Sequence, residues 1–129
     1  MNFPDNLKYT EEHEWLRVEG DIAHVGITEY AQDKLGELVY IEVDTVGETL
    51  AQNEVFGTVE AVKTTSDLFM PVSGEVLEFN PTLDENEGDD PTAVNSDPYG
   101  EGWIVKIRMT DPKQVDELMD NTAYQAVID

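Results

Sequence analysis

The lysine at position 63 is the residue whose setting most favours chemistry, because it is the only Lys or Arg between Lys34 and Lys106. A projecting, unhindered amine can be joined in an amide to an activated carboxylic acid, so Lys63 could carry a covalently attached prosthetic group. An ordinary exposed turn lysine is the simpler interpretation, since most charged side chains are solvated surface. The surroundings of Lys63 must therefore decide between these two interpretations.

Few other residues offer the chemistry of a site. The chain contains no cysteine, so it can form no disulfide, supply no thiolate nucleophile and build no thiolate metal site. His13 and His24 lack the spacing and the neighbouring ligands of a zinc site, and we expect packing or hydrogen-bonding roles for them. The acidic stretch at residues 84–90 departs from the calcium-loop spacing, because Gly88 is its fifth residue rather than its sixth. We therefore expect no metal site and no catalytic residue.

Two runs of strand-like sequence flank Lys63 and predict a β-hairpin with the amine at its tip. Residues 55–62 lead into the lysine, and residues 68–72 lead away from it. Alternation places the odd-numbered residues of the first run, from Val55 to Ala61, on one face of the strand. We expect this face to point into the core.

The remaining sequence predicts many short strands and three short helices. Alternating apolar residues predict a strand pair within residues 14–26 and single strands at residues 38–43, 75–79 and 103–109. Helices are predicted after the N-cap Thr28, from Pro112, and from about Asn121. A long polar excursion separates two of the strands, at residues 80–102. The pattern favours a mainly β sandwich or barrel that forms one domain over residues 1–129.

The composition is that of a strongly acidic globular protein. The chain has 129 residues, of which 40% are hydrophobic, and its formal net charge is −22. Such a charge repels nucleic acid and anionic lipid, so we expect neither as a partner and expect protein partners to present positive surfaces. No basic segment followed by an apolar stretch opens the sequence, and no run approaches the roughly 18 apolar residues of a membrane span. A cytoplasmic protein is expected.

A series of motifs that extends over essentially the whole chain resembles one known family. The segment Glu60-Ala61-Val62-Lys63-Thr64-Thr65-Ser66-Asp67 resembles the lipoylation site of the glycine cleavage system H proteins. Further blocks of the family occur in family order, among them Leu7-Lys8-Tyr9, His13-Glu14-Trp15, Val25-Gly26-Ile27-Thr28, Pro71-Val72-Ser73-Gly74-Glu75-Val76, Val94-Asn95-Ser96 and Gly102-Trp103. Several blocks at consistent spacing outweigh the general expectation that a turn lysine is ordinary surface.

The resemblance implies a lipoyl-type barrel-sandwich hybrid with a few short helices, including C-terminal helices, and a function as a carrier rather than an enzyme. Lipoate would be joined in an amide to Lys63 by a lipoate ligase or lipoyl transferase. The lipoyl group would take an aminomethyl group from a pyridoxal-phosphate glycine decarboxylase and pass it to a tetrahydrofolate-dependent aminomethyltransferase. A dihydrolipoamide dehydrogenase would then reoxidise it. Glu14 and Asp67 carry over by position as candidate contacts to the loaded arm, where a carboxylate could hold the protonated amine of the cargo.

Two positions depart from the family pattern, and two other functions can be compared with it. Ala61 replaces the customary serine two residues before the lysine, and Glu12 stands where some relatives carry serine. Biotin carriers favour methionine on both sides of their modified lysine, whereas Lys63 lies between Val62 and Thr64. An acidic interaction module that acts through charge alone would keep its partners after Lys63→Arg. That substitution therefore separates such a module from a carrier.

Overall fold

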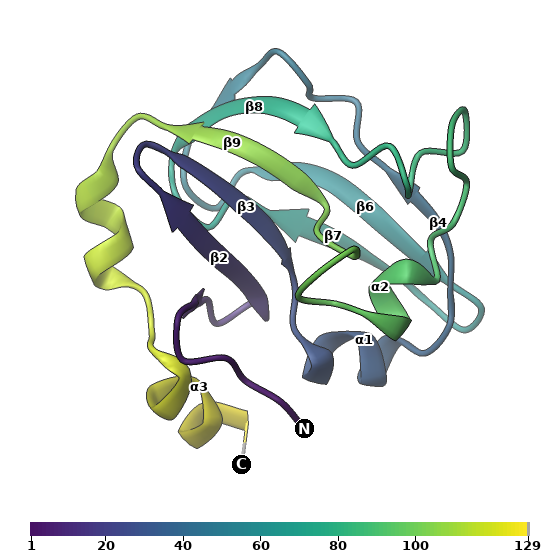
Figure 1. Ribbon diagram of the computed structural model, residues 1–129, viewed down its shortest axis with the longest axis horizontal. Helices are drawn as coiled ribbons and strands as arrows, with labels where there is room; N and C mark the ends of the chain where they lie inside the picture. The colour runs from purple at the N-terminus through teal and green to yellow at the C-terminus, as the bar shows by residue number, and fades with distance from the viewer. Residues whose placement is uncertain (129) are drawn as a thin grey trace.

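The computed structural model describes residues 1–128 and shows two antiparallel sheets with short helices, which confirms the predicted mainly β fold (Figure 1). The larger sheet has the order β1-β2-β3-β9-β8-β5, with β1 at Lys8–Tyr9, β2 at Glu14–Glu19, β3 at Ile22–Ile27, β9 at Val105–Met109, β8 at Gly74–Phe79 and β5 at Thr49–Leu50. The smaller sheet has the order β4-β6-β7, with β4 at Leu38–Glu42, β6 at Val55–Ala61 and β7 at Thr65–Phe69. The helices are α1 at Glu29–Leu35, α2 at Ala93–Ser96, the 3₁₀ helix η1 at Pro112–Glu117 and α3 at Asn121–Ile128.

The main core lies between the two sheets. Leu16, Val25 and Ile107 of the larger sheet belong to the same buried cluster as Val59 and Leu68 of the smaller sheet. Strand alternation explains this arrangement, because each strand sends every second side chain inward. Removal of this apolar surface from water is the main term that holds the sheets together.

A second apolar cluster joins the C-terminal helix to the start of the chain. Leu7, Tyr9, Trp15 and Tyr124 are all buried in it. The rings of Tyr9 and Tyr124 are stacked with their centroids 4.9 Å apart and their planes 8° from parallel. Figure 1 accordingly shows α3 beside the N-terminal segment, at one end of the molecule. The last helix is thus packed against β1 and β2.

Lys63 lies at the tip of the hairpin formed by β6 and β7, as the sequence predicts. The turn is closed by a hydrogen bond of 2.7 Å from the Ala61 N–H to the Thr64 carbonyl. Beside it, the Val62 N–H donates to the Glu37 carbonyl at 3.2 Å, which ties the turn to the segment that links α1 and β4. The hairpin tip is therefore held from two directions.

The predicted core face of β6 is wrong at the beginning of the strand. Val55 is 43% exposed, whereas Phe56 is completely buried. The cause is a shift in register against β7 between Val55 and Gly57, since a bulge turns the residues on its two sides to different faces. Beyond the bulge the prediction holds, because Gly57, Val59 and Ala61 are buried.

Helix α1 begins and ends as its sequence predicts. The Thr28 side chain accepts a hydrogen bond of 3.1 Å from the Ala31 N–H, which satisfies one of the free donors of the first turn. Gly36 follows the last helical residue with φ +83°, a conformation that glycine adopts without strain. These two ends fix the length of α1, and with it the position of the residues that α1 presents near the hairpin.

The other helices show two differences from the prediction. Helix α2 lies inside the polar excursion at residues 80–102, where no helix is predicted, and the burial of Ala93 and Val94 stabilises it. The helix that starts at Pro112 is a 3₁₀ helix that ends at Glu117, and Leu118 is already extended. None of the helices in residues 1–128 is long and apolar enough to span a membrane.

The edges of both sheets are short or irregular. Strands β1 and β5, at the two edges of the larger sheet, contain 2 residues each. Strand β4 is one edge of the smaller sheet, and its pairing with β6 shifts in register between Leu38 and Tyr40. Strand β7 is the other edge, and it places the exposed carboxylate of Asp67 there.

Candidate functional site

The Lys63 side chain projects from the hairpin tip and lies against the end of α1. A Cβ atom added at Gly36 would be 3.5 Å from Lys63 Cε and 3.9 Å from Lys63 Nζ, so the stem of the lysine passes directly over this glycine. Lys63 is exposed, and it takes part in none of the ion pairs found within residues 1–128. The amine is therefore open to a modifying enzyme.

A cavity of about 240 Å³, here called the hairpin cavity, opens beside this hairpin between α1, β2 and β7. Its apolar wall is formed by Ile27, Ala31, Leu35, Val59 and Leu68. Its polar wall is formed by Glu12, His13, Glu14, Tyr30, Lys34, Ser66 and Asp67. Lys63 is not among the lining residues, and it is connected to the cavity wall through Gly36, which the Lys63 stem contacts and which follows Leu35 in the chain. Both carboxylates predicted from the sequence, Glu14 and Asp67, thus meet in one cavity next to Lys63.

Glu14 is a buried carboxyl group, with an exposed fraction of 2%. It lies two residues before Leu16 on β2, so strand alternation turns it toward the core. Its oxygens accept hydrogen bonds from the Thr10 hydroxyl at 2.8 Å and from the Phe69 N–H at 3.2 Å. Because Phe69 belongs to β7, Glu14 connects the two sheets.

Burial raises the pKa of Glu14 to about 8, although its hydrogen bonds with Thr10 and Phe69 act in the opposite direction. The charged form is disfavoured because the surrounding apolar groups replace water. At neutral pH the side chain therefore keeps its proton while no cation is near. A positive charge in the cavity would favour the ionised form.

Asp67 occupies the open side of the same cavity and is exposed on β7. Lys34 lies on the wall formed by α1, with its Nζ 5.5 Å from the ring centre of Tyr30. No motif in the sequence connects Lys34 or Tyr30 with the site. The available signal was that Tyr30, Ala31 and Leu35 share one face of α1, but helical spacing does not reveal what that face contacts.

His13 contributes to the wall through an unusual backbone conformation and a network of aromatic contacts. Its φ is +71°, which is uncommon for a residue other than glycine. Its ring lies 5.0 Å from the ring of Tyr30, and its Nδ1 lies 2.9 Å from the hydroxyl oxygen of Tyr124. Burial lowers the pKa of His13, which favours the neutral ring. The packing and hydrogen-bonding role predicted for His13 is confirmed, and the histidine is also a wall of the cavity.

The other histidine lies elsewhere. His24 is on β3, where its ring meets the ring of Trp103 edge to face at 5.1 Å. Its Nδ1 is buried and has no hydrogen-bond partner. Within residues 1–128, no group of three or more His, Asp or Glu side chains is placed to hold a metal ion.

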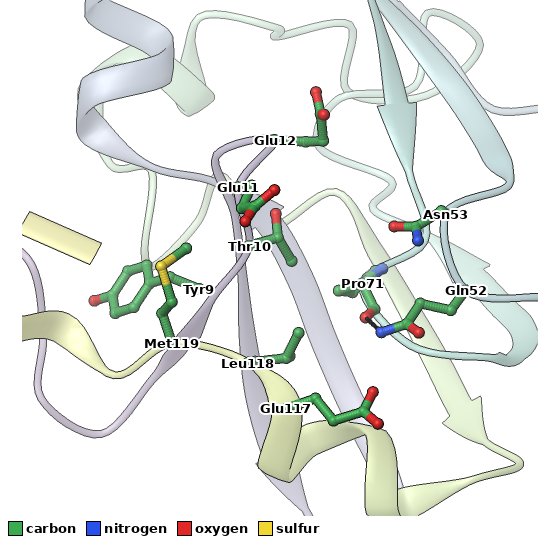
Figure 2. A pocket seen from close by; sticks show the side chains of 10 residues that line it. All are labelled: Tyr9, Thr10, Glu11, Glu12, Gln52, Asn53, Pro71, Glu117, Leu118 and Met119. Carbon is green, nitrogen blue, oxygen red and sulfur yellow. Dashed lines mark hydrogen bonds between the residues drawn. The ribbon is translucent and has the colours of Figure 1, made fainter. Parts of the chain in front are cut away.

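A second cavity, of about 320 Å³, is lined in part by the segment that leads into β2 (Figure 2). Glu11 and Glu12 face it from this segment, Glu117 faces it from η1, and Gln52 and Asn53 face it from the turn before β6. The Gln52 side chain is held by donating to the Pro71 carbonyl at 3.0 Å. Glu12 lines both cavities, so the second cavity adjoins the hairpin cavity, but its lining contains neither Glu14 nor Asp67.

Comparisons with known proteins agree on one family. The family model described as Glycine cleavage H-protein matches residues 7–129. The glycine cleavage system H proteins of Bacteroides thetaiotaomicron and Bacteroides fragilis are 59% and 57% identical to this chain, each over 99% of this chain and 98% of the relative. The crystal structure of a glycine cleavage system H protein from Mycobacterium marinum superposes with a TM-score of 0.84 at 38% identity, over 96% of this chain and 97% of that chain. The chain therefore belongs to the glycine cleavage H-protein family, the lipoyl carriers of the glycine cleavage system.

Proposed function

We propose that lipoate is attached to Lys63 and that the hairpin cavity receives the arm when it carries its cargo. The observation that carries this proposal is the position of Lys63, an exposed amine at a hairpin tip beside a cavity with both apolar and acidic walls. The exposed amine also satisfies what an attaching enzyme requires of its target.

The residues of the cavity fit a lipoyl arm. The apolar wall, which includes Leu35 and Leu68, suits an aliphatic chain, because apolar surface is then removed from water. The carboxyl groups of Glu14 and Asp67 suit a cationic end, because a charge-assisted hydrogen bond is stronger than a neutral one. When bound, lipoate supplies the sulfur chemistry that this cysteine-free chain lacks.

Glu14 has the central role in holding the cargo. An ammonium group beside it favours the ionised carboxylate, so Glu14 gives up its proton when the cargo enters and accepts a hydrogen bond from the cargo. The Thr10 hydroxyl and the Phe69 N–H keep the carboxyl oriented throughout, since both hydrogen bonds are made before any cargo is present. Asp67 adds negative charge at the open side of the cavity.

The protein is a carrier subunit and not a catalyst. Its partners in the glycine cleavage system are the pyridoxal-phosphate glycine decarboxylase, the tetrahydrofolate-dependent aminomethyltransferase and the dihydrolipoamide dehydrogenase. We further propose that a lipoate ligase or lipoyl transferase loads Lys63, that residues 1–129 form one domain, and that the protein works in the cytoplasm. The continuous core supports the single domain, and the net charge of −22 supports docking through positive partner surfaces.

Intact-mass measurement with peptide mapping tests the attachment site. We expect incubation with lipoate, ATP and a lipoate ligase to add one lipoyl group to the wild-type protein, and none to Lys63→Arg. The matched control is Lys106→Arg, which should be modified normally, since Lys106 lies in an ion pair with Glu78 on the larger sheet. In a reconstituted glycine cleavage system, Lys63→Arg should lose all turnover. A lipoyl group on another residue, or full turnover with Lys63→Arg, would refute the proposal.

A further inference from the structure

The hydroxyl group of Tyr124 connects the C-terminal helix to the hairpin cavity. Tyr124 is completely buried, and its hydroxyl oxygen lies 2.9 Å from His13 Nδ1 and 2.8 Å from the Thr28 side-chain oxygen. These three residues are far apart in the sequence, and they come from α3, from the start of β2 and from the start of α1. Tyr124 itself does not line the cavity.

Each partner of this hydroxyl controls one part of the cavity wall. His13 is a wall residue, and its ring contacts the ring of Tyr30, another wall residue. Thr28 is the N-cap of α1, the helix that supplies Tyr30, Ala31, Lys34 and Leu35 to the cavity. The Thr28 N–H also donates to the His13 carbonyl at 3.0 Å, so the two partners are joined to each other.

The hydrogen bonds of the network depend on one another. The Thr28 oxygen already accepts from the Ala31 N–H, and its single hydrogen can go to Tyr124. The Tyr124 hydroxyl then donates to His13 Nδ1, and in the reverse arrangement His13 donates to Tyr124 and Tyr124 donates to Thr28. In both arrangements the Tyr124 hydroxyl donates one hydrogen bond and accepts another, and so binds His13 and Thr28 at the same time. Removal of the Tyr124 hydroxyl leaves the buried Thr28 hydroxyl and the half-buried His13 ring with one partner fewer each, and a buried polar group without its partner costs free energy.

We infer that Tyr124 is a positioning residue of the carrier: its hydroxyl fixes His13 and the start of α1 relative to each other, so the C-terminal helix sets the shape of the hairpin cavity and the lifetime of the cargo held there. The effect of Tyr124 on the lifetime of the cargo rests on the proposed function of the cavity. Its effect on the positions of His13 and α1 does not, because those contacts are made by the unmodified protein.

Tyr124→Phe tests the inference, with Tyr9→Phe as the matched control. Tyr9 is equally buried and stacks on Tyr124, but its hydroxyl donates to the Pro4 carbonyl at 2.6 Å and touches neither His13 nor Thr28. Both variants keep an aromatic ring and lose one buried hydroxyl, so we expect similar losses of thermal stability. Only Tyr124→Phe should change the cavity.

Two measurements separate the variants. In the unmodified protein, amide hydrogen exchange at Ala31 should be faster in Tyr124→Phe than in the wild type and Tyr9→Phe. The reason is that Thr28, whose side chain accepts from the Ala31 N–H, loses its hydrogen bond with the Tyr124 hydroxyl. In the loaded protein, formaldehyde and ammonia should be released about fivefold faster from Tyr124→Phe, the change that corresponds to one net hydrogen bond of ~1 kcal/mol. Release from Tyr9→Phe should equal that of the wild type.

Equal behaviour of Tyr124→Phe and Tyr9→Phe in both measurements would overturn the inference. If Lys63 takes no lipoate, the proposed function fails, while exchange at Ala31 still decides whether Tyr124 positions the wall. Should Tyr124→Phe not fold, His13→Asn removes the other partner and keeps a residue type that adopts positive φ. Faster amide exchange at Ala31 in His13→Asn then supports the inference, and unchanged exchange contradicts it.

Discussion

The two carboxyl groups of the hairpin cavity have opposite surroundings. Glu14 is buried, accepts two hydrogen bonds from fixed donors and has its pKa raised to about 8 by burial. Asp67 lies on an edge strand and is open to water. One end of the cavity is therefore buried and held by hydrogen bonds, and the other is exposed to solvent.

Under the proposed function, this difference in surroundings predicts two different tasks for the two carboxyl groups. A buried carboxyl interacts strongly with a cation, since little water screens the charges, but its ionisation depends on the arrival of that cation. An exposed carboxylate contributes little to any one contact, because water and salt screen it. We expect Glu14 to hold the cargo and Asp67 only to make the entrance more negative.

Glu14→Gln should have the largest effect on retention of the cargo. The amide has nearly the shape of the carboxyl group but cannot become negative, so the charge-assisted hydrogen bond is lost. We expect release of formaldehyde and ammonia from the loaded protein to be about tenfold faster, as the loss of a hydrogen bond to a charged group predicts. Glu11→Gln, an exposed neighbour in the other cavity, is the control and should behave as the wild type. An unchanged lifetime in Glu14→Gln would contradict the role of the buried end.

The pH dependence of stability tests the burial of Glu14 without any cofactor. The pKa of Glu14 is about 8 in the folded state and 4.5 in the reference state, so between these values the folded protein holds a proton that the unfolded chain has released. The free energy of unfolding contributed by this group therefore falls as pH rises from about 4.5 to about 8, and it is constant above that range. Glu14→Gln lacks the titrating carboxyl group and therefore lacks this contribution to the pH dependence.

Urea unfolding of the wild type and Glu14→Gln at pH 5, 7 and 9 measures the effect. The wild type should lose stability relative to Glu14→Gln as pH rises, by an amount on the order of a few kcal/mol, because the other groups titrate alike in both proteins. Parallel curves for the two proteins would mean that Glu14 is solvated in the folded state.

Asp67→Asn should have the smallest effect. Removal of one exposed charge should change the lifetime of the cargo by less than about twofold, and the small change should disappear at high salt. The same release assay at low and high ionic strength measures this. If release from Asp67→Asn were as fast as release from Glu14→Gln, Asp67 would contact the cargo directly. The proposed difference between the two carboxyl groups would then be wrong.

The sequence predicted the hairpin and its lysine because the signals for both are local. Two strand-like runs and a short turn specify the position of Lys63, and the residues on both sides of it carry the family motif. Strand alternation also places Glu14 in phase with Leu16, which points to burial, but it does not say that a cavity lies beside the carboxyl group. Alternation likewise missed the exposed Val55 and the buried Phe56, because a register shift leaves no pattern in the sequence.

The connection between Tyr124 and the cavity could not be predicted, because it joins residues that are 111 and 96 positions apart. No periodicity links a C-terminal helix to the start of β2 across such a separation. The hydrogen bond that the Thr28 side chain accepts from the Ala31 N–H follows from local capping, and the N-cap was predicted, whereas the contact of Thr28 with Tyr124 depends on where α3 packs. Local sequence patterns thus predict the strands, the helices and the position of Lys63. The wall of the hairpin cavity depends on how elements distant in the sequence pack together.

The edge strands of the two sheets limit how copies of this protein associate with one another at high protein concentration. An open strand edge is a template on which another copy can add its own strand, and long growth of this kind leads to aggregation. Here β1 and β5 offer only 2 residues each, β4 is interrupted by a register shift, and β7 carries the charge of Asp67. Every edge is therefore a poor template, and a shuttle that must meet several enzymes in turn can be abundant without polymerising.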